Sequence, residues 1–268
     1  MQLAPVSRKS PPRLENSDAK RPSGLPKGDL LKEALAEQLV KLGELQQRFY
    51  ADQRFALLVV LQGRDASGKD GVIRNVFEPC SPQGVQVTGF KAPSTLERAH
   101  DYLWRIHTHV PPRGMIGIFN RSHYEDVLAV RVHDIVPRKI WKHRFEQIND
   151  FERMLSENNV VILKFFLHIS HEEQRLQLTE RLTDPMKNWK FNEGDLKDRE
   201  LWAKYTRAYH DALAKCSTSW APWFVVPSDS KTARNYLVTR TIVDRLSQLN
   251  LEYPRAEKRI LDLASEIA

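Results

Sequence analysis

The chain has 268 residues, of which 41% are hydrophobic and 28% charged. This length and balance exclude an intrinsically disordered chain and suit one large domain with a sizeable core. The formal net charge of +7 is typical of proteins that bind a polyanion, such as nucleic acid, a membrane surface or a phosphate chain, but an ordinary basic surface gives it too.

The cysteine content and the hydropathy of the chain indicate the cellular compartment of the protein. The two cysteines, Cys80 and Cys216, lie far apart in the sequence and predict no disulfide framework. There is no run of about 18 apolar residues that would span a membrane, and no apolar core of a signal peptide at the N-terminus. The sequence therefore predicts a cytoplasmic protein with no membrane partner.

Residues 1–28 differ in composition from the rest of the chain. They contain five prolines and six basic residues but few apolar ones: Pro5, Pro11, Pro12, Pro22 and Pro26, with Arg8, Lys9, Arg13, Lys20, Arg21 and Lys27. This composition predicts a flexible basic N-terminal arm that precedes the folded domain, residues 29–268.

The domain alternates helices and strands. Apolar residues at helical spacing predict helices over 29–54, 69–77, 95–109, 138–157, 171–182 and 198–215, and a last one from 232. Short apolar runs predict strands over 57–62, 85–90, 115–120, 160–169 and 223–226. Strands that alternate with helices indicate an α/β fold with a parallel sheet and right-handed crossovers.

A glycine-rich turn joins the first strand to the helix that follows it. Its spacing, Gly63-x-x-x-x-Gly68-Lys69, is that of a P-loop, in which backbone N–H groups and the helix dipole hold a phosphate. The usual Ser or Thr after the lysine, whose hydroxyl binds Mg²⁺, is Asp70 here. The turn therefore predicts phosphate chemistry, but not that of a standard nucleoside triphosphatase.

Acidic residues accompany the phosphate-binding signals. Asp65 and Asp70 lie in and just after the loop, and Glu125 and Asp126 follow the strand over 115–120. Carboxylates repel phosphate unless a cation intervenes, and Mg²⁺ is usually held by one or two carboxylates and by phosphate oxygens. We therefore expect these acids to bind Mg²⁺, with Asp65 as the favoured ligand and with Asp70, Glu125 and Asp126 as candidates.

Basic residues follow two of the strands. Arg121 comes where the strand over 115–120 ends, and a guanidinium pairs well with phosphate. After the strand over 160–169, Arg181, Lys187 and Lys190 surround the aromatic Trp189. A charged helix is usually a solvated face, but a lid that closes over phosphates and excludes water also fits here.

These blocks together resemble the family-2 polyphosphate kinases. The matching segments are 65–71, 99–105, 119–126, 164–170, 184–185, 189–191 and 221–223, and the resemblance spans about residues 30–254. The block from Asn120 to Asp126 is specific, whereas the P-loop alone is not.

The resemblance implies a three-layer P-loop kinase fold like that of thymidylate kinase, with a parallel sheet flanked by helices and a helical lid over about 171–197. It implies reversible phosphoryl transfer with Mg²⁺ between inorganic polyphosphate and a nucleoside di- or monophosphate, from ADP to ATP or from AMP to ADP. It gives catalytic roles to Asp65, Lys69, Arg121, Asp126 and Arg181, and it implies that Asp65 and Asp126 hold the metal, with Asp70 and Glu125 as less favoured ligands. It places phosphate or nucleotide contacts at Gly63, Arg64, Ala66, Ser67, Gly68, Asp70, Gly71, Asn120, Lys187 and Lys190. It also implies a homodimer or homotetramer.

A polyphosphate chain carries about one negative charge per phosphate, so a groove of basic residues is expected to hold it. Arg74, Lys91 and Arg131 are the candidates for this groove. Two departures from the family pattern concern the substrates. Gln177 stands where many members carry a basic lid residue, and Arg64 with Ser67 blends features of the subclasses that differ in acceptor.

Two other functions remain open from the sequence. An ATP-dependent nucleoside monophosphate kinase would use the same loop and lid, although Asp70 and the basic charge argue against it. A non-catalytic polyanion-binding protein would explain the charge, but not the acids and basic residues at strand ends. A nucleic-acid partner is disfavoured, because the sequence has no zinc or RNA-binding aromatic motif.

Overall fold

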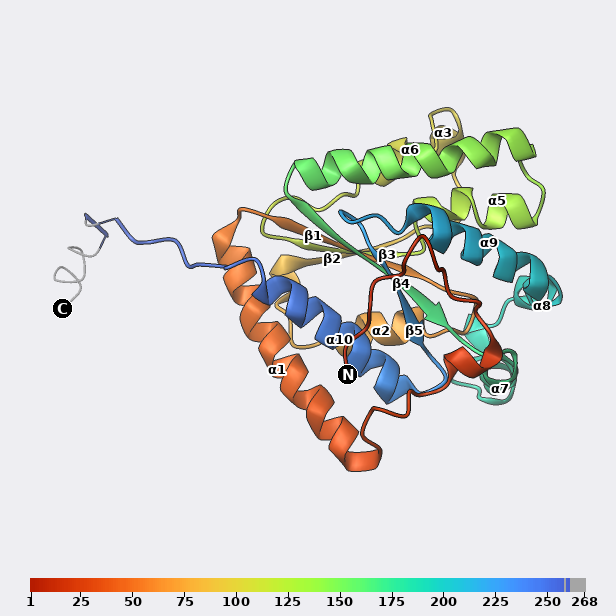
Figure 1. Ribbon diagram of the computed structural model, residues 1–268, viewed down its shortest axis with the longest axis horizontal. Helices are drawn as coiled ribbons and strands as arrows, with labels where there is room; N and C mark the ends of the chain where they lie inside the picture. The colour runs from red at the N-terminus through yellow and green to blue at the C-terminus, as the bar shows by residue number, and fades with distance from the viewer. Residues whose placement is uncertain (258, 261–268) are drawn as a thin grey trace.

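A five-stranded parallel sheet forms the centre of the computed structural model, which describes residues 1–257 and 259–260 (Figure 1). Its strands follow the order β2-β3-β1-β4-β5, and every neighbouring pair is parallel. They are β1 (Ala56–Gln62), β2 (Val85–Gly89), β3 (Ile116–Asn120), β4 (Val160–His168) and β5 (Trp223–Pro227). All five predicted strands are confirmed, and each differs from its predicted range by one residue at one end.

The central strands are apolar because both faces of the sheet are covered. Every residue of β1 and β4 is buried, which explains why these strands read as continuous Val, Leu and Phe runs rather than alternating ones. Their side chains point alternately into two cores, so that Leu58 and Val60 pack in one and Leu57 and Val59 in the other.

Helices form a layer on each face of the sheet (Figure 1). One layer contains α1 (Gly28–Asp52), α2 (Lys69–Val76) and α10 (Lys231–Ser247). The other contains α5 (Ala129–Val132), α6 (Arg138–Glu157) and α9 (Trp202–Cys216). The three-layer α/β fold predicted from the sequence is therefore confirmed. Among the described residues, no helix is long and apolar enough to cross a membrane.

The remaining helices are short or lie at the carboxyl edge of the sheet. They are α3 (Thr95–Arg98), α4 (Trp104–His107), α7 (His171–Thr183) and α8 (Glu193–Glu200), with 3-10 turns η1 (Asn16–Ala19), η2 (Pro82–Gly84), η3 (His123–Asp126) and η4 (Asn188–Lys190). The single helix predicted over 95–109 is wrong, because Asp101 accepts from the N–H groups of Leu103 and Trp104 and starts a second helix.

A buried polar network anchors the turn after β3. Lys164, on the central strand β4, and Glu152, on α6, both have side chains that are 0% exposed and form an ion pair. Glu152 also accepts hydrogen bonds from Tyr124 (3.0 Å) and pairs with Nε2 of His123 (3.1 Å). Because a buried charge needs such partners, the network fixes η3 against the core beneath the sheet edge where Arg121 emerges.

The N-terminal segment is docked on the domain rather than forming the flexible arm that its composition predicts. The N–H of Val6 donates to the carbonyl of Trp223 on β5 (2.8 Å), and the N–H of Asp229 donates to the carbonyl of Ala19 (3.0 Å). Leu14, Ala19 and Leu25 are buried. Sequence composition missed this docking because a few well-placed apolar residues and backbone hydrogen bonds suffice for it.

We expect Leu14→Ala to lower the free energy of unfolding by about 2 kcal/mol, since it removes a side chain that is 5% exposed and packed in one of the two cores. Arg13→Ala, at the exposed neighbouring position, is the matched control and should change little. Urea denaturation of the full chain measures both. Equal stability of the two variants would mean that the segment is not docked in solution.

Candidate active site

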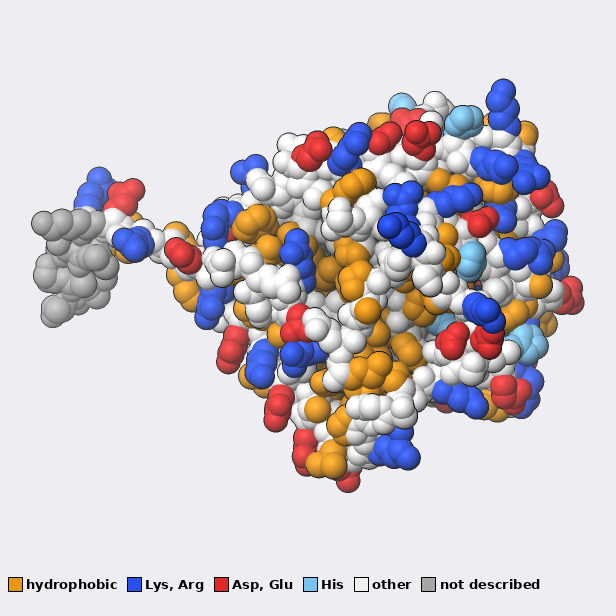
Figure 2. Space-filling model, in the orientation of Figure 1, with side chains coloured by type: hydrophobic (Ala, Val, Ile, Leu, Met, Phe, Trp, Pro, Cys, Tyr) orange, Lys and Arg blue, Asp and Glu red, His pale blue; other side chains and the backbone are white. Residues whose placement is uncertain are grey.

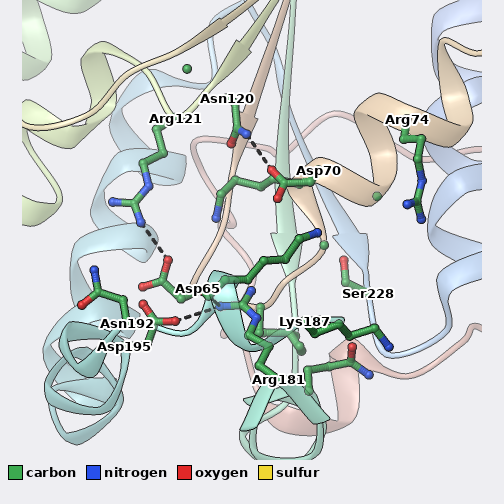
Figure 3. A pocket seen from close by; sticks show the side chains of 18 of the residues that line it. Asp65, Asp70, Arg74, Asn120, Arg121, Arg181, Lys187, Asn192, Asp195 and Ser228 are labelled. Carbon is green, nitrogen blue, oxygen red and sulfur yellow. Dashed lines mark hydrogen bonds and ion pairs between the residues drawn. The ribbon is translucent and has the colours of Figure 1, made fainter. Parts of the chain in front are cut away.

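The candidate active site is a cavity of about 820 Å³ at the carboxyl edge of the sheet (Figure 3). It is lined by the loop after β1, the first turn of α2, the end of β3, one side of α7 and the start of α10. In a parallel sheet all strands end at the same edge, which brings residues from distant parts of the sequence around one space.

The P-loop forms one wall of this cavity. Gly68 has φ +95°, a conformation that favours glycine, and it directly precedes the first residue of α2. A Cβ on Gly63 would lie 2.8 Å from the carbonyl oxygen of Leu167, so the loop also needs glycine where it passes β4. The result is a turn that presents backbone N–H groups and the N-terminus of a helix to the cavity.

Lys69 is held across the loop. Its Nζ donates to the carbonyl oxygens of Gly63 (2.8 Å) and Arg64 (3.2 Å). Burial lowers the pKa of its ammonium, and the nearby Asp65 opposes that effect. The ammonium is therefore held within the turn that binds phosphate in P-loop proteins.

Two polar pairs join the loop to the end of β3, as Figure 3 shows. The Nη2 atom of Arg121 lies 2.7 Å from Oδ1 of Asp65. The Nδ2 atom of Asn120 donates to Oδ1 of Asp70 at 2.8 Å. These pairs bring two carboxylates, an amide and a guanidinium to the mouth of the P-loop.

The structure corrects the predicted role of Asp126. Its carboxylate faces α6, where it pairs with Arg144 (2.9 Å), and it does not line the cavity. Glu125 instead lines a small chamber behind the loop together with Asp65 and Arg121. Burial raises the pKa of Glu125 above its usual value, while Arg121 and Lys69 partly offset that effect. Because η3 is a tight turn, the carboxylates of Glu125 and Asp126 point in different directions. Glu125, predicted as the less favoured metal ligand, is the one that reaches the loop.

The segment after β4 closes the cavity on another side. Arg181 of α7 pairs with Asp195 of α8 at 2.8 Å (Figure 3), and burial raises the pKa of Asp195 to about 6. Lys187 pairs with Glu180 at 2.6 Å. Trp189 lines the cavity while remaining 78% exposed. The predicted lid residues Arg181, Lys187 and Lys190 therefore all line the cavity.

Most residues predicted for the site are brought together by the fold. Those that line the cavity are Asp65, Ala66, Gly68, Lys69, Asp70, Gly71, Arg74, Lys91, Asn120, Arg121, Arg181, Lys187 and Lys190. Gly63, Arg64 and Ser67 are buried within the loop, and Arg64 stacks on Trp202, 3.9 Å from the ring centre.

Arg131, predicted for the polyphosphate groove, is placed elsewhere. It pairs with Asp211 on α9 (2.7 Å) and lies over the ring of Trp141, and it does not line the cavity. These contacts, which lie in the layer of helices α6 and α9, explain why a basic residue stands at this position.

Sequence reasoning missed several cavity residues, namely Asn192, Asp195, Ser228, Lys231 and Arg234. A usable signal existed for the last two. They open the helix that follows the fifth strand, and the start of such a helix lies at the same sheet edge as the P-loop.

The donor set at the loop fits a divalent metal ion. Asp65 and Asp70 are carboxylates that line the cavity beside the phosphate-binding turn, and Mg²⁺ takes one or two such oxygens together with phosphate oxygens and water. Among the described residues, no group of three or more His, Cys, Asp or Glu side chains is arranged to hold a metal by itself. The arrangement thus fits a metal that is shared with a bound phosphate.

A P-loop at a helix start, basic side chains around it and carboxylates beside it define a P-loop phosphotransferase. The particular family follows from the sequence, because residues 27–254 match the family polyphosphate kinase 2. The chain belongs to this family, as the sequence motifs indicate.

Known proteins support this assignment. The chain is 51% identical to an AMP/ADP-polyphosphate phosphotransferase of Meiothermus ruber over 84% of each chain. It is 41% identical to an ADP-polyphosphate phosphotransferase of Rhodopseudomonas palustris, over 88% of this chain and 87% of that one. The crystal structure of polyphosphate kinase 2 from Arthrobacter aurescens is similar with a TM-score of 0.90 and 40% identity, over 93% of this chain and 90% of that one.

Proposed function

We propose that this protein catalyses reversible phosphoryl transfer between inorganic polyphosphate and ADP or AMP, with Mg²⁺. The observation that carries the proposal is the P-loop cavity, whose walls bear Lys69, Arg121 and Arg181, in a chain of the polyphosphate kinase 2 family. The relatives named above use ADP, or AMP and ADP, which makes these two nucleotides the first acceptors to test.

The mechanism follows from the positions of the cations. A phosphate oxygen of the acceptor attacks the terminal phosphorus of the donor, while the leaving oxygen departs on the opposite side. Lys69 and Arg121 line the cavity at the P-loop and Arg181 lines it from α7, so these three cations would stabilise the charge on the transferred group. Since the chemistry needs positioning and charge stabilisation rather than a protein nucleophile, no phospho-enzyme is required.

The metal site belongs to the same arrangement. Asp65 and Asp70 would hold the Mg²⁺, which supplies charge neutralisation for the phosphates when bound. Arg121 keeps Asp65 turned toward the loop through their ion pair, and Asn120 does the same for Asp70. Residues 171–197 would exclude water from the transfer by folding over the phosphates.

The face of the molecule in Figure 2 gives no support to a non-catalytic polyanion-binding protein. On the face in Figure 2, Lys and Arg side chains are interspersed with Asp and Glu rather than gathered into one stripe. A protein that bound nucleic acid through its surface alone would be expected to carry a continuous basic patch. The cations that recur around the P-loop instead point to a phosphate-rich substrate that enters the cavity.

The decisive experiment mixes the purified protein with Mg²⁺, long-chain polyphosphate and either ADP or AMP, and follows nucleotides by chromatography. We expect ATP from ADP and ADP from AMP, with polyphosphate consumed. Failure with both acceptors, combined with phosphorylation of AMP by ATP in the absence of polyphosphate, would establish the nucleoside monophosphate kinase instead. The expectation of a homodimer or homotetramer stays a prediction, which light scattering can test.

A further inference from the structure

Arg234 is a buried charge without an acidic partner. It lies in the first turn of α10 and is 4% exposed, yet it lines the active-site cavity. Its Nη1 donates to the carbonyl oxygen of Ser67 (3.3 Å) and its Nε to Oδ1 of Asn235 (3.2 Å). Over residues 1–257 and 259–260, no carboxylate forms an ion pair with Arg234, and Nη2 has no hydrogen-bond partner.

A guanidinium in this position is costly for the protein. Burial lowers the pKa of Arg234 to about 10, so the group still carries its charge at neutral pH. A buried charge is normally compensated by an opposite charge, and leaving one uncompensated destabilises the fold. Among the described residues, no carboxylate pairs with Arg234. This pattern is expected where a bound anion supplies the opposite charge.

The P-loop is shaped to receive this side chain. A Cβ on Gly68 would collide with Nη1 of Arg234, and a Cβ on Gly71 would lie 3.0 Å from its Nη2. The two glycines therefore let the guanidinium approach the backbone at the start of α2. An anion held by the N-terminus of α2 would lie within reach of both the helix dipole and Arg234.

Two further cations without ion pairs line the same side of the cavity. Arg74 of α2 and Lys231 of α10 form no salt bridge with any described residue. In Figure 3, Arg74 and Ser228 lie on the opposite side of the site from Arg121, Asn192 and Asp195. Arg121 and Arg181 are thus paired with carboxylates, whereas Arg74, Lys231 and Arg234 form no salt bridge among the described residues, and Glu180 interacts with Lys231 only through space.

We propose that Arg234, together with Lys231 and Arg74, binds a phosphate of the polyphosphate donor beyond the one held by the P-loop. This inference rests on the proposed function. A uniformly charged chain needs cations along its length, whereas a nucleotide donor would place a ribose and a base there. Gly68 and Gly71, which Arg234 approaches, and the polar Asn75 and Ser228 also line the cavity. Cations set among such residues favour a phosphate chain over a nucleoside triphosphate as donor.

The test is binding of tripolyphosphate to the full-length protein, measured by calorimetry and by the shift in melting temperature. For Arg234→Met we expect at least a 10-fold rise in Kd and loss of most of the thermal shift. Without ligand, its melting temperature should equal or exceed that of the wild type, because an uncompensated charge has been removed. Arg240→Met is the matched control, because Arg240 lies on the same helix, is partly exposed, pairs with Asp244 and does not line the cavity. The Kd of this variant should not change.

A merely structural Arg234 would give the opposite pattern, with a lower melting temperature and an unchanged Kd, and that result would overturn the inference. If Arg234→Met does not fold, Arg234→Lys and Lys231→Met replace it, and each should weaken tripolyphosphate binding at least 3-fold. Wild-type affinity in both would also overturn it. Binding is measured without turnover, so the inference and the proposed function can fail separately. If the wild-type protein makes no ATP but Arg234→Met still weakens tripolyphosphate binding, the binding site is supported and only the proposed function is wrong.

Discussion

Replacing Lys69 by Ala should lower kcat/KM for phosphoryl transfer by about 10³-fold, the scale seen when a single charge is removed from a phosphoryl-transfer site. The reason is geometric, because Lys69 is buried in the loop and its ammonium lies between two loop carbonyls at the point where the phosphate is held. The measurement is initial-rate ATP formation from ADP and polyphosphate.

The control for this variant is Lys32→Ala on α1, which removes an equal charge from an exposed position 70% accessible to solvent. It should retain wild-type kcat/KM and so separate a local effect from the loss of overall positive charge. Circular dichroism and the melting temperature check that Lys69→Ala is folded. A folded Lys69→Ala protein with more than a tenth of wild-type kcat/KM would contradict the role given to this lysine.

The P-loop was predictable because its function depends on local sequence. A buried strand, a six-residue turn and a helix start are adjacent in the chain, so Gly63, Gly68 and Lys69 identify the site without knowledge of the tertiary structure. The same holds for the five strands, whose apolar runs are continuous because both faces of the sheet are covered.

The features that were missed depend on side-chain direction or on long-range packing. Glu125 and Asp126 are neighbours, and only the turn of η3 against α6 decides which of them faces the loop. Arg234 lies 166 positions from Gly68, so their contact exists only in the folded sheet. The docking of residues 1–28 rests on a few buried side chains, which an average composition does not reveal.

The second prediction with a large expected effect on kcat/KM concerns Glu125, the neighbour of Asp126. We expect Glu125→Gln to lower kcat/KM by about 10²-fold, because the carboxylate faces Arg121 and Asp65 in the chamber behind the loop and helps keep the Arg121 guanidinium in place. Burial of Arg121 disfavours its charge, but Glu125 and Asp65 outweigh this and raise its pKa. Glu125 is thus a positioning residue rather than one that touches substrate.

Asp126→Asn is the matched comparison, one residue away. Burial raises the pKa of Asp126 to about 6, so its charge is not favoured, and Asn can still accept the hydrogen bond from Arg144. We expect less than about 1 kcal/mol of change in stability and little change in kcat/KM. The reverse order of the two effects would restore Asp126 to the role that the sequence suggested.

The pH profile separates positioning by Glu125 from a purely structural effect. Since burial raises its pKa, the carboxylate becomes protonated at a higher pH than an exposed glutamate, and protonation removes the charge that faces Arg121. In the wild type, kcat/KM should therefore fall on the acid side as pH drops through this raised pKa. In Glu125→Gln the activity is already low and that acid limb should be absent. If the acid limb of the kcat/KM profile persists unchanged in Glu125→Gln, another group is responsible for the titration. Glu125 would then not act through its charge.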